Sequence, residues 1–245
     1  MNLFLIKING IFKNGVLRLN PSFFLGWCKP LLNIATNTLS LSQWITQQNK
    51  KKLAFNDFFS WKRNNNKREK LYEFVINQQL LDSTAIDYLE FGVDAGNSFN
   101  WWLQHLKNRD NRFFGFDTFE GLPENWGLFH KAGELSSEVP QIDDERVVFI
   151  KGLFQETLPA FLQNNTLEKN RKKVIHLDAD LFSSTLFVLT SLAPFLNKGD
   201  ILFFDEFNVP NHEFLAFKMF TESYYIKMEP LGAVNNYYQV AFIVI

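Results

Sequence analysis

Two pairs of acidic residues each follow an apolar run, and they are the first candidates for chemistry in this chain. Asp178 and Asp180 end the segment VIHLDAD, and Asp205 and Glu206 lie in ILFFDEF. If the two runs form neighbouring parallel strands, their carboxyl ends face one crevice, where carboxylates repel unless a cation or a proton joins them. Oxygen ligands of this kind suit Mg²⁺, Mn²⁺ or Ca²⁺. The alternative is that the acids cap the following helices, although residues 183–185 (SST) already offer hydroxyl caps.

A metal in such a crevice would serve to activate a hydroxyl group. A sugar or phenolic hydroxyl is protonated at neutral pH, and coordination lowers its pKa and fixes its orientation. Asp178 or Asp180 could take the proton, or His130 or His212 could do so from a loop. The candidate catalytic residues are Asp178, Asp180 and His212, and the alternative for a loop histidine is simple solvation.

A glycine-containing turn upstream points to a bound nucleotide-like cofactor. The segment YLEFGVDAGNSF (88–99) is an apolar strand containing Glu90, followed by Gly92 and Gly96. Glycine permits a sharp turn and the close approach of a ligand. The next apolar run ends at Asp117, 21 residues after Gly96, where a carboxylate can accept the hydroxyl hydrogens of a ribose. Because the turn lacks the G-x-G-x-x-G pattern, ordinary turn glycines and a helix-capping Asp117 remain the alternative.

The elements that must position these residues are apolar runs that alternate with helical patterns from residue 86 onward. Continuous apolar strands separated by helices indicate an α/β fold with a doubly wound, mostly parallel sheet covered on both faces. The last two runs, YYIKME and YYQVAFIVI, are joined by a short turn-rich segment that suits an antiparallel pair. Residues 1–80 show mixed helical periodicity and no chemical motif. They are expected to form a helical arm or lid on a domain of residues 81–245, with substrate covering or dimerisation as the sharper alternative.

Composition bears on partners and compartment. The 245 residues carry 25 Lys and Arg against 26 Asp and Glu. The chain lacks the basic surplus typical of nucleic-acid-binding proteins, so we expect no nucleic-acid partner. The basic cluster at residues 62–70 is interpreted as a solvated helix start. Cys28 is the only cysteine, which rules out an intramolecular disulfide and favours a reducing, cytoplasmic compartment. The sequence has no run of about 18 uninterrupted apolar residues, so we expect no membrane span.

Five segments together resemble the class I S-adenosylmethionine-dependent methyltransferases, and more closely the macrocin O-methyltransferase family, which methylates sugar hydroxyls. They are LEFGVDAGNS, FGFDTFEGLPE, KGLFQETLP, HLDADLFSSTL and KGDILFFDEF, and they occur in the family's order. The resemblance implies a seven-stranded Rossmann-like sheet with an antiparallel last strand. It also implies Mg²⁺ or Mn²⁺ at Asp178, Asp205 and Glu206, with Asp180 close by. The implied cofactor-binding residues are Glu90, Phe91, Gly92, Gly96, Ser98, Asp117, Thr118, Gly152, Phe154 and Asp178.

The sequence is interpreted as a metal-assisted O-methyltransferase that acts on a hydroxyl of a small molecule such as a glycan or nucleotide sugar. A homo-oligomer is left open. Residues 120–144 form a loop long enough to act as a lid, in which Trp126 and Phe129 could wall the site or only anchor the loop. The chain departs from the family where it has Glu206 for an aspartate and Phe182 for a tyrosine. These departures leave open a non-catalytic cofactor-binding or assembly protein. A nicotinamide-dependent oxidoreductase is the enzymatic alternative, although the acids after the later strands would then have no purpose.

Overall fold

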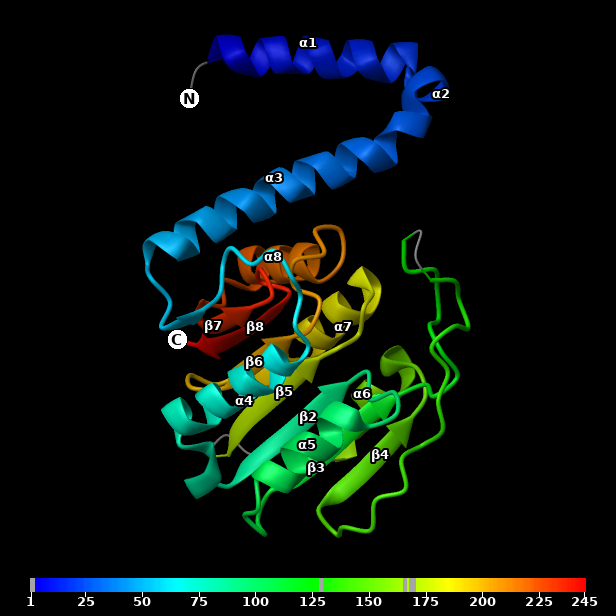
Figure 1. Cartoon of the computed structure of the whole chain (residues 1–245). Helices are drawn as coiled ribbons and strands as arrows, with labels where there is room; N and C mark the ends of the chain where they lie inside the picture. The colour runs from blue at the N-terminus through cyan, green and yellow to red at the C-terminus, as the bar shows by residue number, and fades with distance from the viewer. Residues whose placement is uncertain (1–2, 128–129, 165–166, 168–170) are drawn as a thin grey trace.

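A central eight-stranded sheet organises the computed structural model, which describes residues 3–127, 130–164, 167 and 171–245. The strand order is β1-β7-β8-β6-β5-β2-β3-β4 (Figure 1). The strands are β1 (Phe55–Asn56), β2 (Ile86–Phe91), β3 (Arg112–Asp117), β4 (Val147–Lys151), β5 (Lys172–Leu177), β6 (Ile201–Phe204), β7 (Met228–Val234) and β8 (Gln239–Val244).

Strand directions confirm the expected α/β fold and correct its strand number. Strands β2 to β6 pair in parallel, and β8 runs antiparallel to both β6 and β7. The antiparallel last strand was expected. The eighth strand is β1, which pairs with β7 over only two residues. A strand this short has no periodic pattern that a sequence could reveal.

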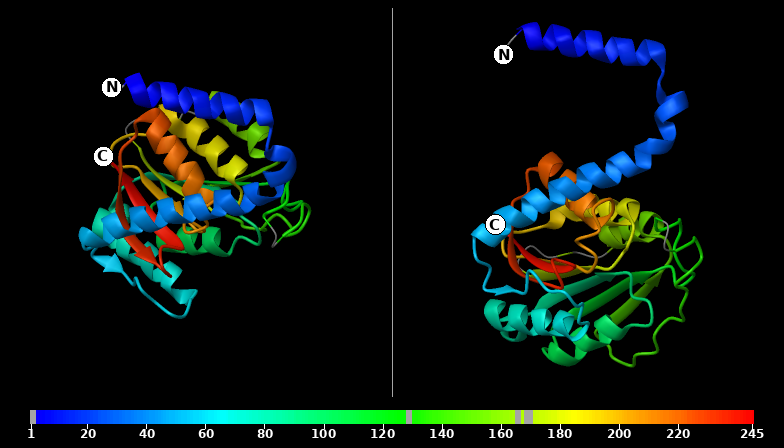
Figure 2. Two further views of the ribbon diagram at one scale, coloured as in Figure 1. Left: turned by 90° about the horizontal axis from the view of Figure 1, so that it is seen from above. Right: turned by 45° about the horizontal axis from the view of Figure 1, so that its top comes forward.

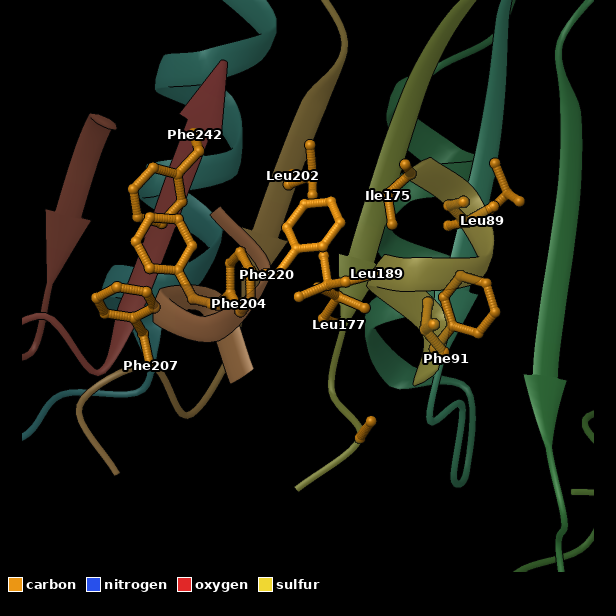
Figure 3. Packing of buried hydrophobic residues seen from close by; sticks show 14 of the residues in the cluster. Leu89, Phe91, Ile175, Leu177, Leu189, Leu202, Phe204, Phe207, Phe220 and Phe242 are labelled. Atoms are coloured by element: carbon orange, nitrogen blue, oxygen red, sulfur yellow. The ribbon is translucent and has the colours of Figure 1, made fainter. Parts of the chain in front are cut away.

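Helices cover both faces of the sheet. One face carries α4 (Asn66–Gln79) and α5 (Asn97–His105), and the other carries α6 (Phe154–Asn164), α7 (Phe182–Leu192) and α8 (Glu213–Tyr224). Phenylalanines pack together between the sheet and the second group of helices, among them Phe204, Phe207 and Phe242 (Figure 3). Burial of such rings on both faces explains why the strands read as continuous apolar runs.

The register of the parallel strands brings the chemical segments to one edge. Phe91 of β2 lies opposite Leu177 of β5, and Leu177 lies opposite Phe204 of β6. The residues that follow these strands are therefore neighbours: the Asp178 amide donates to the Phe91 carbonyl (2.9 Å), and the Asp205 amide donates to the Leu177 carbonyl (3.0 Å). Strand β2 has β5 on one side and β3 on the other, so this edge includes the switch point at which doubly wound sheets bind ligands.

The N-terminal helices form an arm, defined here as residues 3–50: α1 (Leu3–Leu19), α2 (Ser22–Leu25), η1 (Gly26–Cys28) and α3 (Lys29–Lys50). The second half of α3 packs on the body, where Trp44 contacts the rings of Phe207, Phe217 and Phe242. Helix α1 stands away from the body in Figure 1 and in the right view of Figure 2. Within residues 1–80, β1 and α4 lie on the sheet, and the division of the chain at residue 80 stays a prediction. No helix among the described residues has the length and apolar character needed to cross a bilayer.

Candidate active site

A cleft of about 500 Å³ lies at the carboxyl ends of the parallel strands. It is bordered by the turn after β2, the end of β3, the start of α6, the ends of β5 and β6, and the loop that follows β3. The predicted site residues that line it are Gly92, Asp117, Thr118, Phe154, Asp178, Asp180, Asp205 and Glu206. The structure therefore brings the two halves of the predicted site, the glycine turn and the acid cluster, into one cleft.

Gly92 is required by the close approach of two loops. Its φ is +96°, and a Cβ at this position would lie 1.8 Å from the carbonyl oxygen of Asp178. Only glycine tolerates both the backbone conformation and the contact. The turn after β2 is consequently held directly against the chain that carries the acids after β5.

Asp117 fixes the shape of the turn. Its Oδ2 accepts the amides of Val93 and Asp94, both at 2.8 Å, and its Oδ1 accepts the Phe119 amide at 2.7 Å. A carboxylate has about four acceptor positions, so three are used by the protein and one remains for a ligand hydroxyl. The residue is both a structural anchor of the turn and an acceptor that faces the cleft.

Several predicted cofactor residues lie behind the cleft wall rather than on it. Glu90 is fully buried and accepts hydrogen bonds from the hydroxyls of Tyr88 and Ser98. Phe91 stacks on Phe116, with ring centroids 4.7 Å apart. Gly96 and Gly152, both with positive φ, shape the starts of α5 and of the segment leading to α6. Their direct contact with a cofactor stays a prediction.

The acids divide into two groups that share Asp178. Carboxylate oxygens of Asp178, Asp180 and Glu206 lie within 4.8 Å of one another, and a second such group joins His176, Asp178 and Asp205. The predicted metal set of Asp178, Asp205 and Glu206 does not occur as one group among the described residues. The reason is that the Asp205 carboxylate turns toward Arg68 (3.2 Å) and the His176 ring (3.8 Å).

Crowding of negative charge perturbs these groups. Burial, followed by the charges of Asp178 and Asp205, raises the pKa of Glu206 well above its usual range. Burial and the Asp205 charge raise the pKa of Asp180 to about 7. Burial opposes ionisation of Asp205 as well, but the nearby His176 ring and the Arg68 charge outweigh it, so the pKa of Asp205 is lowered.

The donor set fits a hard divalent cation. The buried Oε2 of Glu206 has no hydrogen-bond partner among the described residues, and an unpaired buried carboxylate oxygen is costly. Glu206 belongs to the group formed with Asp178 and Asp180, which consists only of oxygen ligands. Such a group can hold Mg²⁺ or Mn²⁺, whereas Asp205 already pairs with the Arg68 guanidinium.

Arg63 and Arg68 are cleft residues that the sequence interpretation missed. Arg68, in the first turn of α4, pairs with Asp205 and lies 3.9 Å from Asp178 Oδ2. The Arg63 guanidinium lies 3.7 Å from the ring centroid of Tyr238, which also lines the cleft. The signal was the basic cluster at residues 62–70, but its spacing gave no reason to direct Arg68 at acids more than a hundred residues away, or Arg63 at Tyr238.

The two loop histidines occupy different places. His130 lines the cleft, its Nδ1 lies 2.9 Å from Glu134 Oε2, and its ring stacks on Trp126. His212 precedes α8 and does not line the cleft; its Nδ1 accepts weakly from the Phe182 amide at 3.4 Å, and burial lowers its pKa. Phe129, the second expected wall residue, lies outside the described residues.

A parallel sheet that ends in an antiparallel strand, with a glycine turn and an acid after the next strand, defines the class I methyltransferase architecture. Comparison with known proteins agrees, since residues 89–207 match the model of a methyltransferase domain. A tetracenomycin rhamnosyl 4'-O-methyltransferase of Streptomyces olivaceus is 27% identical over 56% of this chain and 59% of its own length. Mycinamicin III 3''-O-methyltransferase of Micromonospora griseorubida is 25% identical over 59% of this chain and 64% of its own length.

Solved structures show the same fold. The calicheamicin methyltransferase CalS11 superposes with a TM-score of 0.58 at 20% identity, covering 85% of this chain and 91% of its own. The O-methyltransferase NovP gives a TM-score of 0.54 at 21% identity, covering 73% and 78%. The chain therefore has the methyltransferase fold and resembles O-methyltransferases in sequence. It spans about three fifths of the length of the two curated relatives.

Proposed function

We propose that the protein transfers a methyl group from S-adenosylmethionine to a hydroxyl of a sugar or other small-molecule acceptor, assisted by Mg²⁺ or Mn²⁺. The observation that carries the proposal is the position of the Asp117-anchored turn and the group Asp178, Asp180 and Glu206 in one cleft. The names of the relatives support a sugar acceptor, since they specify methylation of a rhamnosyl group and a mycinamicin.

The residues of the glycine turn are suited to hold the cofactor. Gly92 lines the cleft, and the remaining acceptor position of Asp117 suits a ribose hydroxyl. Phe154, at the start of α6, offers an apolar surface beside the turn. The cofactor supplies an activated methyl group, so the task left to the protein is to hold the acceptor oxygen in line with it.

The acid group is suited to orient the acceptor. A divalent cation held by Asp178, Asp180 and Glu206 would lower the pKa of the acceptor hydroxyl and fix its direction. We assign the role of proton acceptor to His130 rather than His212. The Glu134 carboxylate occupies Nδ1 of His130, so a neutral ring has its free lone pair on Nε2.

A methyl-transfer screen tests this function. Nucleotide sugars and glycans are incubated with labelled S-adenosylmethionine, with EDTA and then with excess Mg²⁺. We expect transfer that EDTA abolishes and Mg²⁺ restores, and a larger rate loss in His130→Gln than in His212→Gln. Absence of S-adenosylhomocysteine binding by calorimetry would refute the cofactor assignment, whereas transfer that persists in EDTA would refute only the metal assignment.

A further inference from the structure

The arm exposes an apolar face that no described residue covers. On α1, Leu5, Ile8, Phe12 and Leu19 recur at helical spacing and share one side, and Phe12 and Leu19 are 70% and 80% exposed. The first half of α3 adds Leu31, Leu32, Ile34 and Leu39, all exposed. Monomeric proteins rarely leave contiguous apolar patches larger than a few hundred Å² in water. The exposed apolar face of the arm is therefore typical of a surface that binds a partner.

An aromatic corner lies where the arm bends. Phe23, Phe24 and Trp27 occupy the short α2 and η1 segments between the two long helices (Figures 1 and 2). Phe23 is 85% exposed and Trp27 is 74% exposed. Exposed Trp and Phe beside an amphipathic helix are characteristic of segments that lie at the boundary between lipid headgroups and acyl chains.

The basic charge of the arm indicates which kind of surface it can bind. The arm contains five basic residues and no acidic residue, whereas the remainder of the chain carries 20 basic and 26 acidic residues. On α1, Lys7, Lys13 and Arg18 lie outside the apolar face defined by Leu5, Ile8, Phe12 and Leu19, together with the exposed Ile11 and Leu17. Pairing of one arm with another would bring only basic side chains together, so a second copy could complement the charge of the arm only through its acidic remainder. A surface with anionic groups on the outside and an apolar layer below them complements both the basic side chains and the apolar face of the arm.

We propose that the arm binds an anionic lipid surface. Helix α1 lies in the plane of the headgroups with Phe12 and its neighbours directed into the bilayer, and the aromatic corner inserts beside it. The basic side chains contact the lipid phosphates, and each adds attraction to an anionic leaflet. The inference is independent of the proposed methyl transfer, because none of the arm residues lines the cleft.

Vesicle flotation with the full chain tests the proposal. We compare vesicles of phosphatidylcholine alone with vesicles that also contain phosphatidylglycerol, and expect at least about tenfold stronger binding to the latter, weakened by salt. Phe12→Asp places a charge in the apolar face and should reduce binding by about tenfold or more. Trp61→Ser is the matched control, since Trp61 is 92% exposed but lies outside the arm, and it should bind as the unmodified protein does.

Two results would overturn the proposal. One is binding that does not depend on anionic lipid or on Phe12. The other is a stable dimer by light scattering that Phe12→Asp converts to a monomer, which would show that a second copy covers the arm. Unchanged affinity of Phe12→Asp for S-adenosylhomocysteine verifies that the variant is folded, whatever the outcome for methyl transfer.

Discussion

Replacement of Arg68 by methionine separates the role of the internal cation from that of a metal. The guanidinium lies 3.2 Å from Asp205 Oδ2 and 3.9 Å from Asp178 Oδ2. Unit charges about 4 Å apart interact by about 4 kcal/mol at an effective dielectric constant of about 20. The Arg68 side chain is 28% exposed, so solvent screens part of this energy, and we expect a net loss of ~1–3 kcal/mol of stability in EDTA.

The same substitution should tighten metal binding. Arg68→Met removes a positive charge next to Asp178, so a divalent cation meets less repulsion; ~1.4 kcal/mol of relief corresponds to about tenfold in affinity. Calorimetric titration with Mn²⁺ and denaturant unfolding with and without Mn²⁺ measure the two effects. Arg63→Met is the matched control, because Arg63 lines the same cleft and stacks on Tyr238 without a described ion pair to the acids. Equal Mn²⁺ affinity in the Arg68 variant, the Arg63 variant and the unmodified protein would refute the reasoning.

Three further predictions concern the turn and the acids. Asp117→Asn should weaken S-adenosylhomocysteine binding by about 10–100-fold in calorimetry, since an amide nitrogen cannot accept the amide hydrogens now bound; unchanged affinity would contradict the anchor role. Gly92→Ala should prevent stable folding because its Cβ would meet the Asp178 carbonyl oxygen at 1.8 Å, whereas Gly133→Ala, with φ +84° but nothing within 4 Å, should lower stability by only about 1–2 kcal/mol. Similar melting temperatures for the two variants would disprove this. Asp180→Asn should lower Mn²⁺ affinity about tenfold or more while leaving S-adenosylhomocysteine affinity within about twofold, and equal losses of both would exclude separate cofactor and metal groups.

Much of the fold could be predicted because the sheet is buried on both faces. Strands such as β2 and β5 then appear as unbroken apolar runs, and the residue after each run falls at the same sheet edge. This is why the acids after β5 and β6 could be expected in one crevice, whereas the resemblance to known methyltransferases placed Gly92 and Asp117 in the same site as Asp178. The two-residue β1 left no comparable pattern.

The direction of individual side chains could not be predicted in the same way. Asp205 and Glu206 are adjacent in sequence, but Asp205 turns toward Arg68 and His176, whereas Glu206 joins Asp178 and Asp180. This division depends on the packing of α4 over the sheet, which local sequence does not encode. The exposure of the apolar face of the arm could not be predicted either, because amphipathic periodicity indicates an apolar face without indicating what covers it.

The central claim is that one cleft holds a methyl donor and a divalent cation close together. The most direct measurement is the NMR relaxation of S-adenosylmethionine labelled with ¹³C at its transferable methyl, bound to the protein and titrated with Mn²⁺. We predict strong paramagnetic broadening of the methyl resonance that excess Mg²⁺ reverses and that Asp178→Ala removes. A bound methyl resonance that remains sharp at saturating Mn²⁺ would contradict the claim.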